Sequence, residues 1–261
     1  MEPWLALTRE VSSRLAECEL THRSREPIDV DRARQQHLAY EGALAALGCR
    51  VERIDPLDDH PDGVFVEDAA VVLDHQAVLT RSGAESRRGE LDTVAAGLAP
   101  YRELVGLESP AQLDGGDVLR LGEKLFVGLS SRTNEAAVAA LSRLAAEEEI
   151  TVTGVAVRGC LHLKTAVTAL DPGCVLLNPR YVDAAEFGVD HIAVDPDEPD
   201  AANVLAIEGR VIVPSAHPRT AERIARRGFE IHDVDVSELA KAEAGVTCCS
   251  LVFQVRNGME R

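Results

Sequence analysis

The sequence predicts an α/β protein in which five similar units are arranged around one axis, and three observations lead to this prediction. Five segments share one pattern: a polar cluster, an apolar strand, a Gly- or Asp-containing turn and often a second strand. Amphipathic, helix-like stretches separate these segments. Hydrophobic residues make up 46% of the chain but aromatic residues only 3%, so Ala, Val, Leu and Ile must form the core. Such cores suit sheets that helices cover, and repeated units of this kind indicate a closed radial arrangement.

The five segments recur at intervals of tens of residues and contain hairpin signals. Their ranges are 66–81, 113–129, 161–178, 201–215 and 247–258. The predicted turns are Asp74-His75, Gly122-Glu123, Asp171-Pro172-Gly173 and Glu208-Gly209. One strand fits in the fifth segment, so we expect a strand near Trp4–Thr8 to complete that unit. The alternative is an ordinary α/β sandwich whose strands look alike because all strands do.

Helices are predicted between the strand segments, where helix-forming residues show amphipathic spacing. Their ranges are 31–47, 85–98, 131–146 and 218–228. Gly48 is suited to end the first helix, because glycine adopts the left-handed backbone that closes many helices. The stretch 181–200 fits no element of the pattern. We expect residues 1–261 to form a single domain.

The formal charge of −17, from 27 basic and 44 acidic residues, argues against a nucleic-acid partner. Solubility alone explains such a charge, although an acidic field also attracts cationic ligands. The N-terminal residues lack the pattern of a signal peptide, and no run approaches the roughly 18 apolar residues of a membrane helix. The six cysteines form no C-x-x-C pair, so we expect free thiols in the cytoplasm. A monomer and a homodimer are both compatible with the sequence.

Polar residues at equivalent positions precede the first strand of each unit. Alignment of the segments brings Asp68, Asp117, Lys164, Asn203 and Cys249 into register. Because equivalent positions of a radial repeat face one axis, we expect these residues and their neighbours to meet at one end of the centre. The neighbours with chemically useful side chains are Asp62, Glu67, Asp114, His162 and Cys248.

A cysteine beside a histidine is the set of groups needed for nucleophilic catalysis. Carboxylates beside them raise the pKa of a thiol, which suits a protease poorly. They do suit a guanidinium group, whose planar N–H donors match carboxylate oxygens. Taken alone, each residue has a structural explanation: Cys248 as a small buried hydrophobe, His162 as a hydrogen-bonded core histidine, and Asp114-Gly115-Gly116-Asp117 as a turn. Their shared repeat position favours a common pocket.

The sequence contains no G-x-G-x-x-G, P-loop or H-E-x-x-H motif, and its eight histidines lack metal-ligand spacing. We therefore expect no cofactor and no resident metal. Zinc captured by Cys248, His162 and a carboxylate would act as an inhibitor rather than as a cofactor.

Six motifs appear in order along the chain. They are DGVFVED (62–68), SRR (86–88), LDGGD (113–117), GLSSRTN (128–134), LHLK (161–164) and TCCS (247–250). Together they resemble the motifs of the dimethylarginine dimethylaminohydrolase family, within the guanidino-group-modifying, or pentein, superfamily. The resemblance implies one catalytic domain, 1–261, with the fold of a five-bladed α/β propeller. It also implies hydrolysis of asymmetric dimethylarginine or monomethylarginine to citrulline and a methylamine, without a cofactor.

By position in these motifs, the resemblance gives a role to each candidate residue of the reacting centre. Cys248 would be the nucleophile and His162 the general acid and base, with Asp114 as the third catalytic residue. Asp68 and Asp114 would hold the guanidinium, and Glu67 would lie close by.

The same resemblance places residues at the amino-acid end of the substrate. Arg87 and Arg132 would bind its carboxylate, and Asp62 with the backbone carbonyl of Leu20 would bind its amino group. Residues 18–27 would then form a mobile loop over the pocket.

Ala242 and Glu243, shortly before the nucleophile, complete the predicted substrate-binding set. Glu243 stands where the family pattern has an Asp, which keeps the charge but lengthens the side chain. Because carboxylates surround the thiol, we predict that Cys248 is mostly protonated in the empty enzyme and is activated when a cation binds.

Rival functions remain open. Arginine deiminases have the same implied fold and chemistry but usually carry an inserted helical region that is not apparent here, and amidinotransferases also tend to be larger. A different class is a non-catalytic propeller in which Cys248 and Cys249 form a vicinal-thiol redox switch. The expected partner of the enzyme is a small cationic amino acid, with neither nucleic acid nor membrane.

Overall fold

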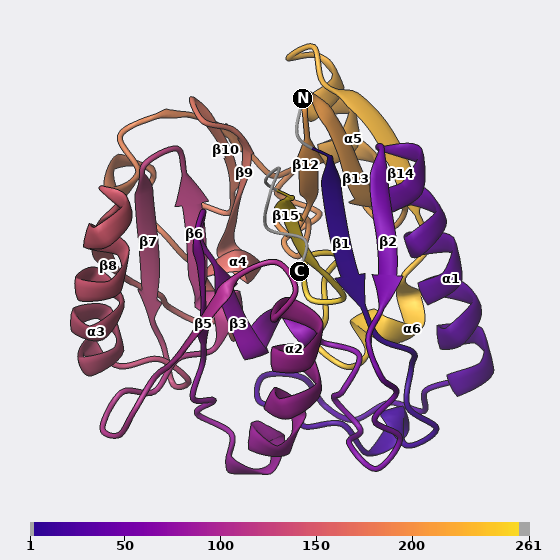
Figure 1. The fold of residues 1–261 in the computed structure, drawn as a ribbon. Helices are drawn as coiled ribbons and strands as arrows, with labels where there is room; N and C mark the ends of the chain where they lie inside the picture. The colour runs from indigo at the N-terminus through magenta and orange to yellow at the C-terminus, as the bar shows by residue number, and fades with distance from the viewer. Residues whose placement is uncertain (1–2, 256–261) are drawn as a thin grey trace.

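Five three-stranded sheets form the framework of the chain, described for residues 3–255 in a computed structural model. In each sheet the first strand pairs antiparallel with the second, and the second pairs parallel with the third. The connection between the parallel strands contains a helix or a helical turn, so each sheet is one ββαβ unit. The sheets are the blades of a five-bladed α/β propeller (Figure 1), and the sandwich alternative is wrong.

The blades follow one another along the chain, and blade 5 uses both of its ends. Blade 1 contains β3 (Ala70–Val72), β4 (Gln76–Leu79), α2 (Leu91–Leu98) and β5 (Glu103–Gly106). Blade 2 contains β6 (Val118–Leu121), β7 (Lys124–Leu129), α3 (Glu135–Ala145) and β8 (Thr151–Ala156). Blade 3 contains β9 (Val167–Asp171), β10 (Cys174–Leu177) and β11 (Asp190–Ala193). Blade 4 contains β12 (Leu205–Ile207), β13 (Arg210–Pro214), α5 (Pro218–Ala225) and β14 (Glu230–Val234).

Blade 5 closes the ring as the sequence predicts. It joins β15 (Leu251–Gln254) to β1 (Trp4–Thr8), which continues through α1 (Val30–Ala46) into β2 (Cys49–Arg53). Strands β15 and β1 pair antiparallel, and Figure 1 shows the yellow C-terminal strand beside the indigo N-terminal one. Residues 256–258 of the fifth predicted segment lie outside the described residues.

Five separate hydrophobic clusters lie between neighbouring blades, and alternation along the middle strands creates them. In β7, for example, Leu125 and Val127 face blade 1, whereas Phe126 faces blade 3. Successive side chains of a strand point to opposite faces, so a strand with a blade on each side must be apolar at every position. This explains why the strands read as continuous runs of Val, Leu and Ile.

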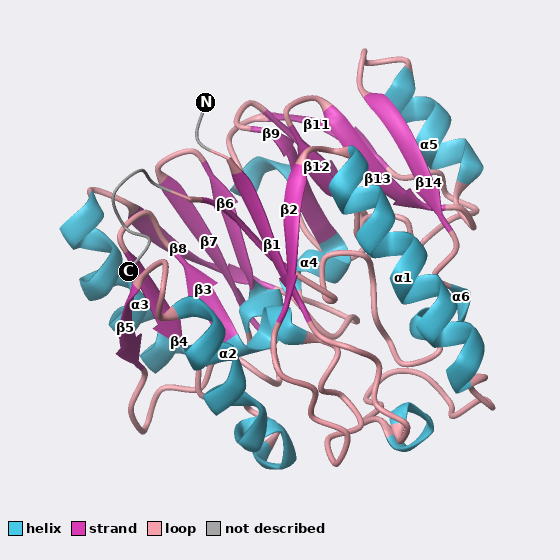
Figure 2. Cartoon of the chain, turned by 45° about the vertical axis from the view of Figure 1, so that its right-hand side comes forward, coloured by secondary structure: helices cyan, strands magenta, loops and turns pink. Residues whose placement is uncertain are grey.

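Helices cover the outer side of the blades (Figure 2). Helix α1 begins after Asp29, whose side chain accepts the N–H of Arg32, and the chain turns at Gly48 with φ 96°. Helix α3 begins at Glu135 rather than at the predicted residue 131, because Asn134 caps it. In the stretch 181–200, blade 3 has only a 3₁₀ turn, Ala184–Glu186, before β11. Among residues 3–255, no helix has the length and apolar character needed to cross a membrane.

Candidate active site

Five turns, one before the first strand of each blade, meet around the propeller axis. The turns of blades 1 and 2 are 3₁₀ helices, Val66–Ala69 and Gly115–Asp117, and that of blade 3 is α4 (Leu163–Ala166). A hydrogen bond joins each turn to the next, at 2.8 to 3.2 Å. The donor–acceptor pairs are Gly116 N to Asp68 Oδ1, Leu163 N to Asp117 Oδ1, Asn203 Nδ2 to Lys164 O, Thr247 N to Asn203 Oδ1 and Glu67 N to Cys248 O. The register of the sequence repeat therefore brings the polar residues together at one place.

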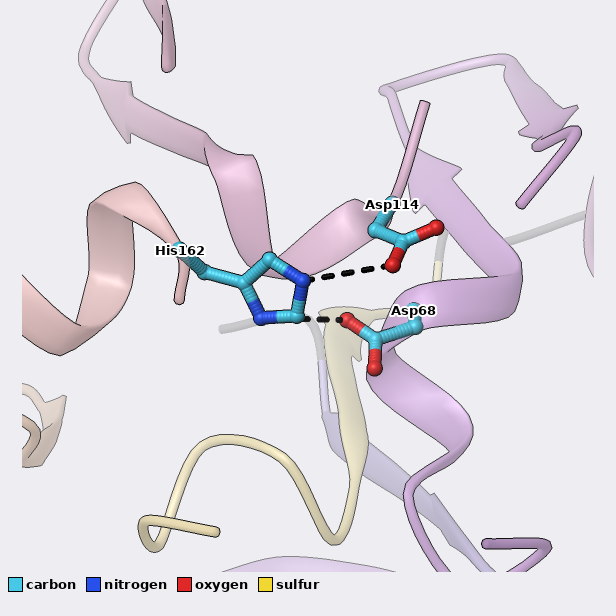
Figure 3. Close-up of side chains that lie close together, drawn as sticks. All are labelled: Asp68, Asp114 and His162. Carbon is cyan, nitrogen blue, oxygen red and sulfur yellow. Dashed lines mark hydrogen bonds and ion pairs between the residues drawn. The ribbon is translucent and has the colours of Figure 1, made fainter. Parts of the chain in front are cut away.

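His162 lies between two carboxylates (Figure 3). Its Nε2 is 3.2 Å from Oδ2 of Asp114, and its Nδ1 is 3.9 Å from Oδ1 of Asp68. Burial disfavours the charged ring, but Asp68, Asp114 and Asp117 outweigh it and raise the pKa of His162 to about 9. The imidazole is therefore protonated at neutral pH and can act first as an acid.

Asp68 and Arg87 form a buried ion pair beside this histidine. Nη1 of Arg87 contacts Oδ2 of Asp68, and its Nε and Nη2 bind the carboxylate of Glu90 at 3.1 and 2.9 Å. Burial opposes ionisation, yet His162 and Arg87 hold the pKa of Asp68 below its usual range. Nη2 of Arg87 also donates to the carbonyl of Phe65, so most of its donors have protein partners.

Cys248 lies in the turn before β15, where the N–H of Gly245 points to its sulfur at 3.3 Å. Burial, together with the charges of Glu67 and Asp68, raises the pKa of the Cys248 thiol to about 12. Its neighbour Cys249 is buried, and neither thiol is in a disulfide. The pKa agrees with a nucleophile that stays protonated while the cavity is empty.

Glu67 belongs to a buried network beside Cys248. Its Oε1 is 2.6 Å from Nζ of Lys164, and its Oε2 accepts the hydroxyl of Thr247 at 2.8 Å. Burial is the main reason that the pKa of Glu67 is raised. Glu67 and Lys164 also line a larger cavity of about 840 Å³, which is separate from the cavity that holds Cys248 and His162.

The cavity between Cys248 and His162 has a volume of about 30 Å³, which is room for one or two water molecules. Eight of the predicted site residues line it: Asp62, Asp68, Arg87, Arg132, His162, Ala242, Glu243 and Cys248. The other three, Leu20, Glu67 and Asp114, do not line it, although Asp114 contacts His162. Within the described residues, Asp68, Asp114 and His162 also offer ligand atoms within 4.8 Å of one another, a set able to hold a cation.

Comparisons with known proteins agree with this geometry. A family model described as arginine deiminase matches residues 57–198. The dimethylarginine dimethylaminohydrolase of Streptomyces coelicolor is 42% identical over 247 residues, 94% of this chain and 95% of that protein. Its counterpart from Pseudomonas aeruginosa is 36% identical over 230 residues, 86% of this chain and 90% of the other. This chain belongs to the dimethylarginine dimethylaminohydrolase family.

Solved structures of this family have the same fold. The Pseudomonas aeruginosa enzyme, as a Cys-to-Ser mutant complexed with citrulline, superposes with a TM-score of 0.92 at 31% identity and covers 97% of this chain and 100% of that one. The N-terminal domain of a cyanobacterial arginine dihydrolase, ArgZ, gives a TM-score of 0.87 at 19% identity, over 97% and 98% of the two chains. The latter likeness shows the fold alone.

The loop of residues 18–23, called the covering loop below, contacts residues that line the cavity. Oδ2 of Asp62 accepts the N–H of Glu19 at 3.1 Å, and Glu19 lies 3.6 Å from the guanidinium of Arg132. Nη2 of Arg132 also donates to the hydroxyl of Thr21 at 3.3 Å. Leu20 packs against the hydrophobic cluster between blades 4 and 5. The loop therefore rests on residues predicted to bind the amino-acid end of the substrate.

Glu243 binds the same loop through its side chain. Its two oxygens accept the backbone N–H groups of Thr21 and His22, at 2.9 and 2.6 Å, and also that of Arg23. Its backbone has a φ of 60°, in the left-handed region that is costly for residues other than glycine. The side chain of Glu243 thus reaches the loop.

Three residues of the site went unassigned from the sequence. Glu90 pairs with Arg87, Glu19 lines the cavity, and Asp117 binds the turns that carry His162 and Arg132. Asp117 had a signal in the repeat, since it aligns with Asp68. Glu90 lies three residues after Arg87, a spacing at which helical side chains meet.

Proposed function

We propose that this chain hydrolyses Nω-methylated L-arginine to L-citrulline and a methylamine through a covalent intermediate on Cys248. The observation that carries the proposal is the cavity in which Cys248 and His162 lie together with the carboxylate of Asp68. A thiol and an acid–base group at one cavity fit nucleophilic catalysis, and a carboxylate fits a planar cation. Family membership supports the same reaction.

The reacting end of the substrate is placed between the carboxylates. Asp68 and Asp114 hold the guanidinium in plane, and Glu67 adds negative charge on the far side of Cys248. The bound cation offsets the carboxylate charges that raise the pKa of the Cys248 thiol. The substrate itself therefore promotes formation of the thiolate.

The amino-acid end is placed under the covering loop. Arg132, with its side chain 12% exposed at the cavity, binds the carboxylate together with Arg87. Asp62 and the carbonyl of Leu20 bind the amino group, and Ala242 and Glu243 complete the wall. A cavity of about 30 Å³ is too small for an amino acid, so the loop must move aside for entry.

Bond changes then follow in two halves. The thiolate of Cys248 attacks the guanidinium carbon, and the imidazolium of His162 gives its proton to the departing methylamine nitrogen. The products of this half are the free amine and an S-alkylthiouronium on the enzyme. His162, now neutral, removes a proton from water, and the hydroxide oxygen bonds to the same carbon. As the C–S bond breaks, the remaining proton of the water passes to the sulfur, so citrulline is released and Cys248 returns as the thiol; the proton that this thiol lost on activation is taken up by the released amine.

Arginine deiminase activity is a second candidate, because the matching family model carries that description. The arginine deiminase of Mycobacterium avium is 26% identical over 247 residues, which are 76% of this chain and 60% of that protein. Its reaction would use the same nucleophile and acid–base group, with ammonia as the leaving group. Space near the departing nitrogen distinguishes the two.

The test is citrulline release from the purified protein supplied with asymmetric dimethylarginine, monomethylarginine and arginine in parallel. Turnover of the methylated substrates, lost in Cys248→Ser, is the expected result. Turnover of arginine alone would move the chain to the deiminases. Absence of citrulline with all three would overturn the proposal. We also place the enzyme in the cytoplasm, where its six free cysteines would stay reduced.

A further inference from the structure

Asp117 is a buried carboxylate outside the cavity that accepts three hydrogen bonds. It ends the 3₁₀ turn of blade 2 and has no exposed surface. Oδ1 accepts the N–H of Leu163 at 2.8 Å, and Oδ2 accepts the hydroxyls of Ser130 and Thr133, both at 2.6 Å. Burying a carboxylate is costly unless it is fully hydrogen-bonded, and here several donors converge on it.

One side of Asp117 holds the acid–base histidine. Leu163 is the first residue of α4, and His162 precedes it as the N-cap. The bond from Leu163 to Asp117 therefore fixes the peptide that follows His162. This restrains the direction in which the imidazole points, toward Asp114 and Asp68.

The other side holds the turn that carries Arg132. Ser130 and Thr133 flank this arginine, and Oγ of Ser130 accepts the N–H of Arg132 at 3.0 Å. Oγ1 of Thr133 accepts the N–H of Asp114 at 3.2 Å, and Oδ2 of Asp114 is 3.8 Å from the guanidinium of Arg132. Oδ2 of Asp117, through Ser130 and Thr133, thus sets the positions of both Arg132 and Asp114.

We propose that Asp117 is a positioning residue, whose carboxylate fixes His162 and Arg132 relative to each other. This inference rests on the function proposed above. His162 serves the reacting carbon and Arg132 the substrate carboxylate, so the distance between them must match the length of the substrate. Asp117 contacts neither the cavity nor, by this proposal, the substrate.

A comparison within the repeat explains why a carboxylate is used. Asn203 is in register with Asp117 and links blades 4 and 5, with its side-chain oxygen accepting the N–H of Thr247 at 3.0 Å. A neutral amide is therefore sufficient to join two blades. Asp117 must also accept two hydroxyl donors, Ser130 and Thr133, on its second oxygen. An amide N–H₂ at that place would be a donor, so the carboxylate serves the turn of Arg132.

Steady-state kinetics of two variants can separate the effect of Asp117 on His162 from its effect on Arg132. Asp117→Asn keeps the size of the side chain, and we expect kcat to fall about 10- to 100-fold and KM to rise. Ser130→Ala removes a hydroxyl whose hydrogen bonds are to Asp117 and to the N–H of Arg132, and it leaves the bond between Thr133 and Asp114 in place, so we expect a rise in KM with kcat retained within about threefold. A purely structural role would give both variants the same kinetic change.

A second measurement needs no substrate, which separates failure of this inference from failure of the proposed function. The pKa of His162 is followed by NMR titration of the ligand-free protein. Asp117→Asn should lower it, because one of three surrounding carboxylates is lost. The carboxylates nearest His162 are Asp68, Asp114 and Asp117, and Arg87 and Arg132 contact the first two. Cys160 contacts the carbonyl of His162, and the other charged or titratable groups that line its cavity are Glu19, Asp62, Glu243 and Cys248.

Glu198→Gln is the matched control, since Glu198 is also buried and accepts the N–H groups of Arg219 and Thr220 at 3.0 and 2.7 Å. It should lower thermal stability without changing kcat, KM or the pKa of His162. Asp117→Asn with a lower Tm but a wild-type pKa of His162 would overturn the inference, whether or not the wild-type protein turns over methylated arginine.

Discussion

Oε1 of Glu243 accepts the backbone N–H of His22 at 2.6 Å, and this contact holds the covering loop against the segment that leads to Cys248. The N–H groups of Thr21 and Arg23 point to the same carboxylate. Hydrogen bonds to a charged acceptor are about twice as strong as neutral ones. Glu243 lies five residues before Cys248 and holds the loop together with Asp62 and Arg132.

Glu243→Gln should loosen this loop. The amide keeps one accepting oxygen but replaces the second with a donor, so at least one bond to the loop is lost. Losing about 1 to 2 kcal/mol predicts hydrogen exchange of amides 21–23 that is roughly 5- to 30-fold faster. Mass spectrometry of a peptide spanning this loop measures the change.

Glu148→Gln provides the control for this prediction. Glu148 also uses its carboxylate to accept three successive backbone N–H groups, those of Asp74, His75 and Gln76 at 2.6 to 3.1 Å. Glu148 lies after α3 in blade 2 and binds the hairpin of blade 1, so Glu148→Gln should leave exchange at 21–23 unchanged. Unaltered protection of those amides in Glu243→Gln would refute the role of Glu243.

Local pattern in the sequence was sufficient to predict the antiparallel strand pair of each blade. Strands with a neighbour on each face are apolar at every position, and turns such as Glu208-Gly209, with φ of 50° and 82°, carry their own signal. The repeat register then placed Asp68 and His162 near one axis.

Contacts that depend on side-chain reach could not be predicted in this way. Glu243 meets Thr21 across 222 positions of sequence, with no periodic pattern to indicate it. The start of α3 was predicted too early, because in the sequence Asn134 cannot be told apart from a polar residue inside the helix, whereas in the structure it caps the helix. The stretch 181–200 lacks the amphipathic run of the other blades, and its strand Asp190–Ala193 is recognisable only by its pairing with β10.

Reactivity of Cys248 should depend on the charge in the cavity. Burial with Glu67 and Asp68 raises the pKa of the thiol to about 12, so alkylation by iodoacetamide at pH 7.5 should be slow in the empty enzyme. A small amidinium such as acetamidine should shift the alkylation profile to lower pH. Glu67→Gln should produce part of that shift without ligand. An alkylation profile that shifts neither with acetamidine nor in Glu67→Gln would contradict substrate-promoted activation. Peptide mapping distinguishes alkylation of Cys248 from that of Cys249.

Binding of the amino group should depend on the ionisation of Asp62. Burial raises the pKa of Asp62 to about 6, so the free carboxylate forms only above that pH. We expect kcat/KM to rise about tenfold per pH unit below 6 and then to level off. Asp62→Asn should remove this limb and raise KM. If kcat/KM of Asp62→Asn still rises with pH below 6, another group causes this rise.

The same group has a stability effect of opposite sign to that of an ordinary surface carboxylate. Its folded pKa lies above the unfolded value, so the folded state holds the proton more tightly. The contribution of Asp62 to the free energy of unfolding is present below about pH 4 and is lost as pH rises to about 6. Urea titrations between pH 4 and 7 measure this change: the free energy of unfolding of the wild type should fall with rising pH more than that of Asp62→Asn does.

Gly116 allows His162 and Asp68 to approach each other, and a single methyl group tests this. A Cβ at residue 116 would lie 2.6 Å from Nδ1 of His162 and 2.8 Å from Oδ1 of Asp68. These distances are shorter than van der Waals contact, so Gly116→Ala must move the imidazole or the carboxylate. We expect kcat to fall at least 100-fold, since a displacement of about 1 Å at a reacting group has that effect.

Gly106→Ala, at a site with no atom within 4 Å of the added Cβ, is the control and should keep wild-type kcat. Steady-state kinetics beside thermal unfolding of both variants decides the matter, because a kcat within twofold of wild type in folded Gly116→Ala would mean that His162 is not held in the geometry described for this site.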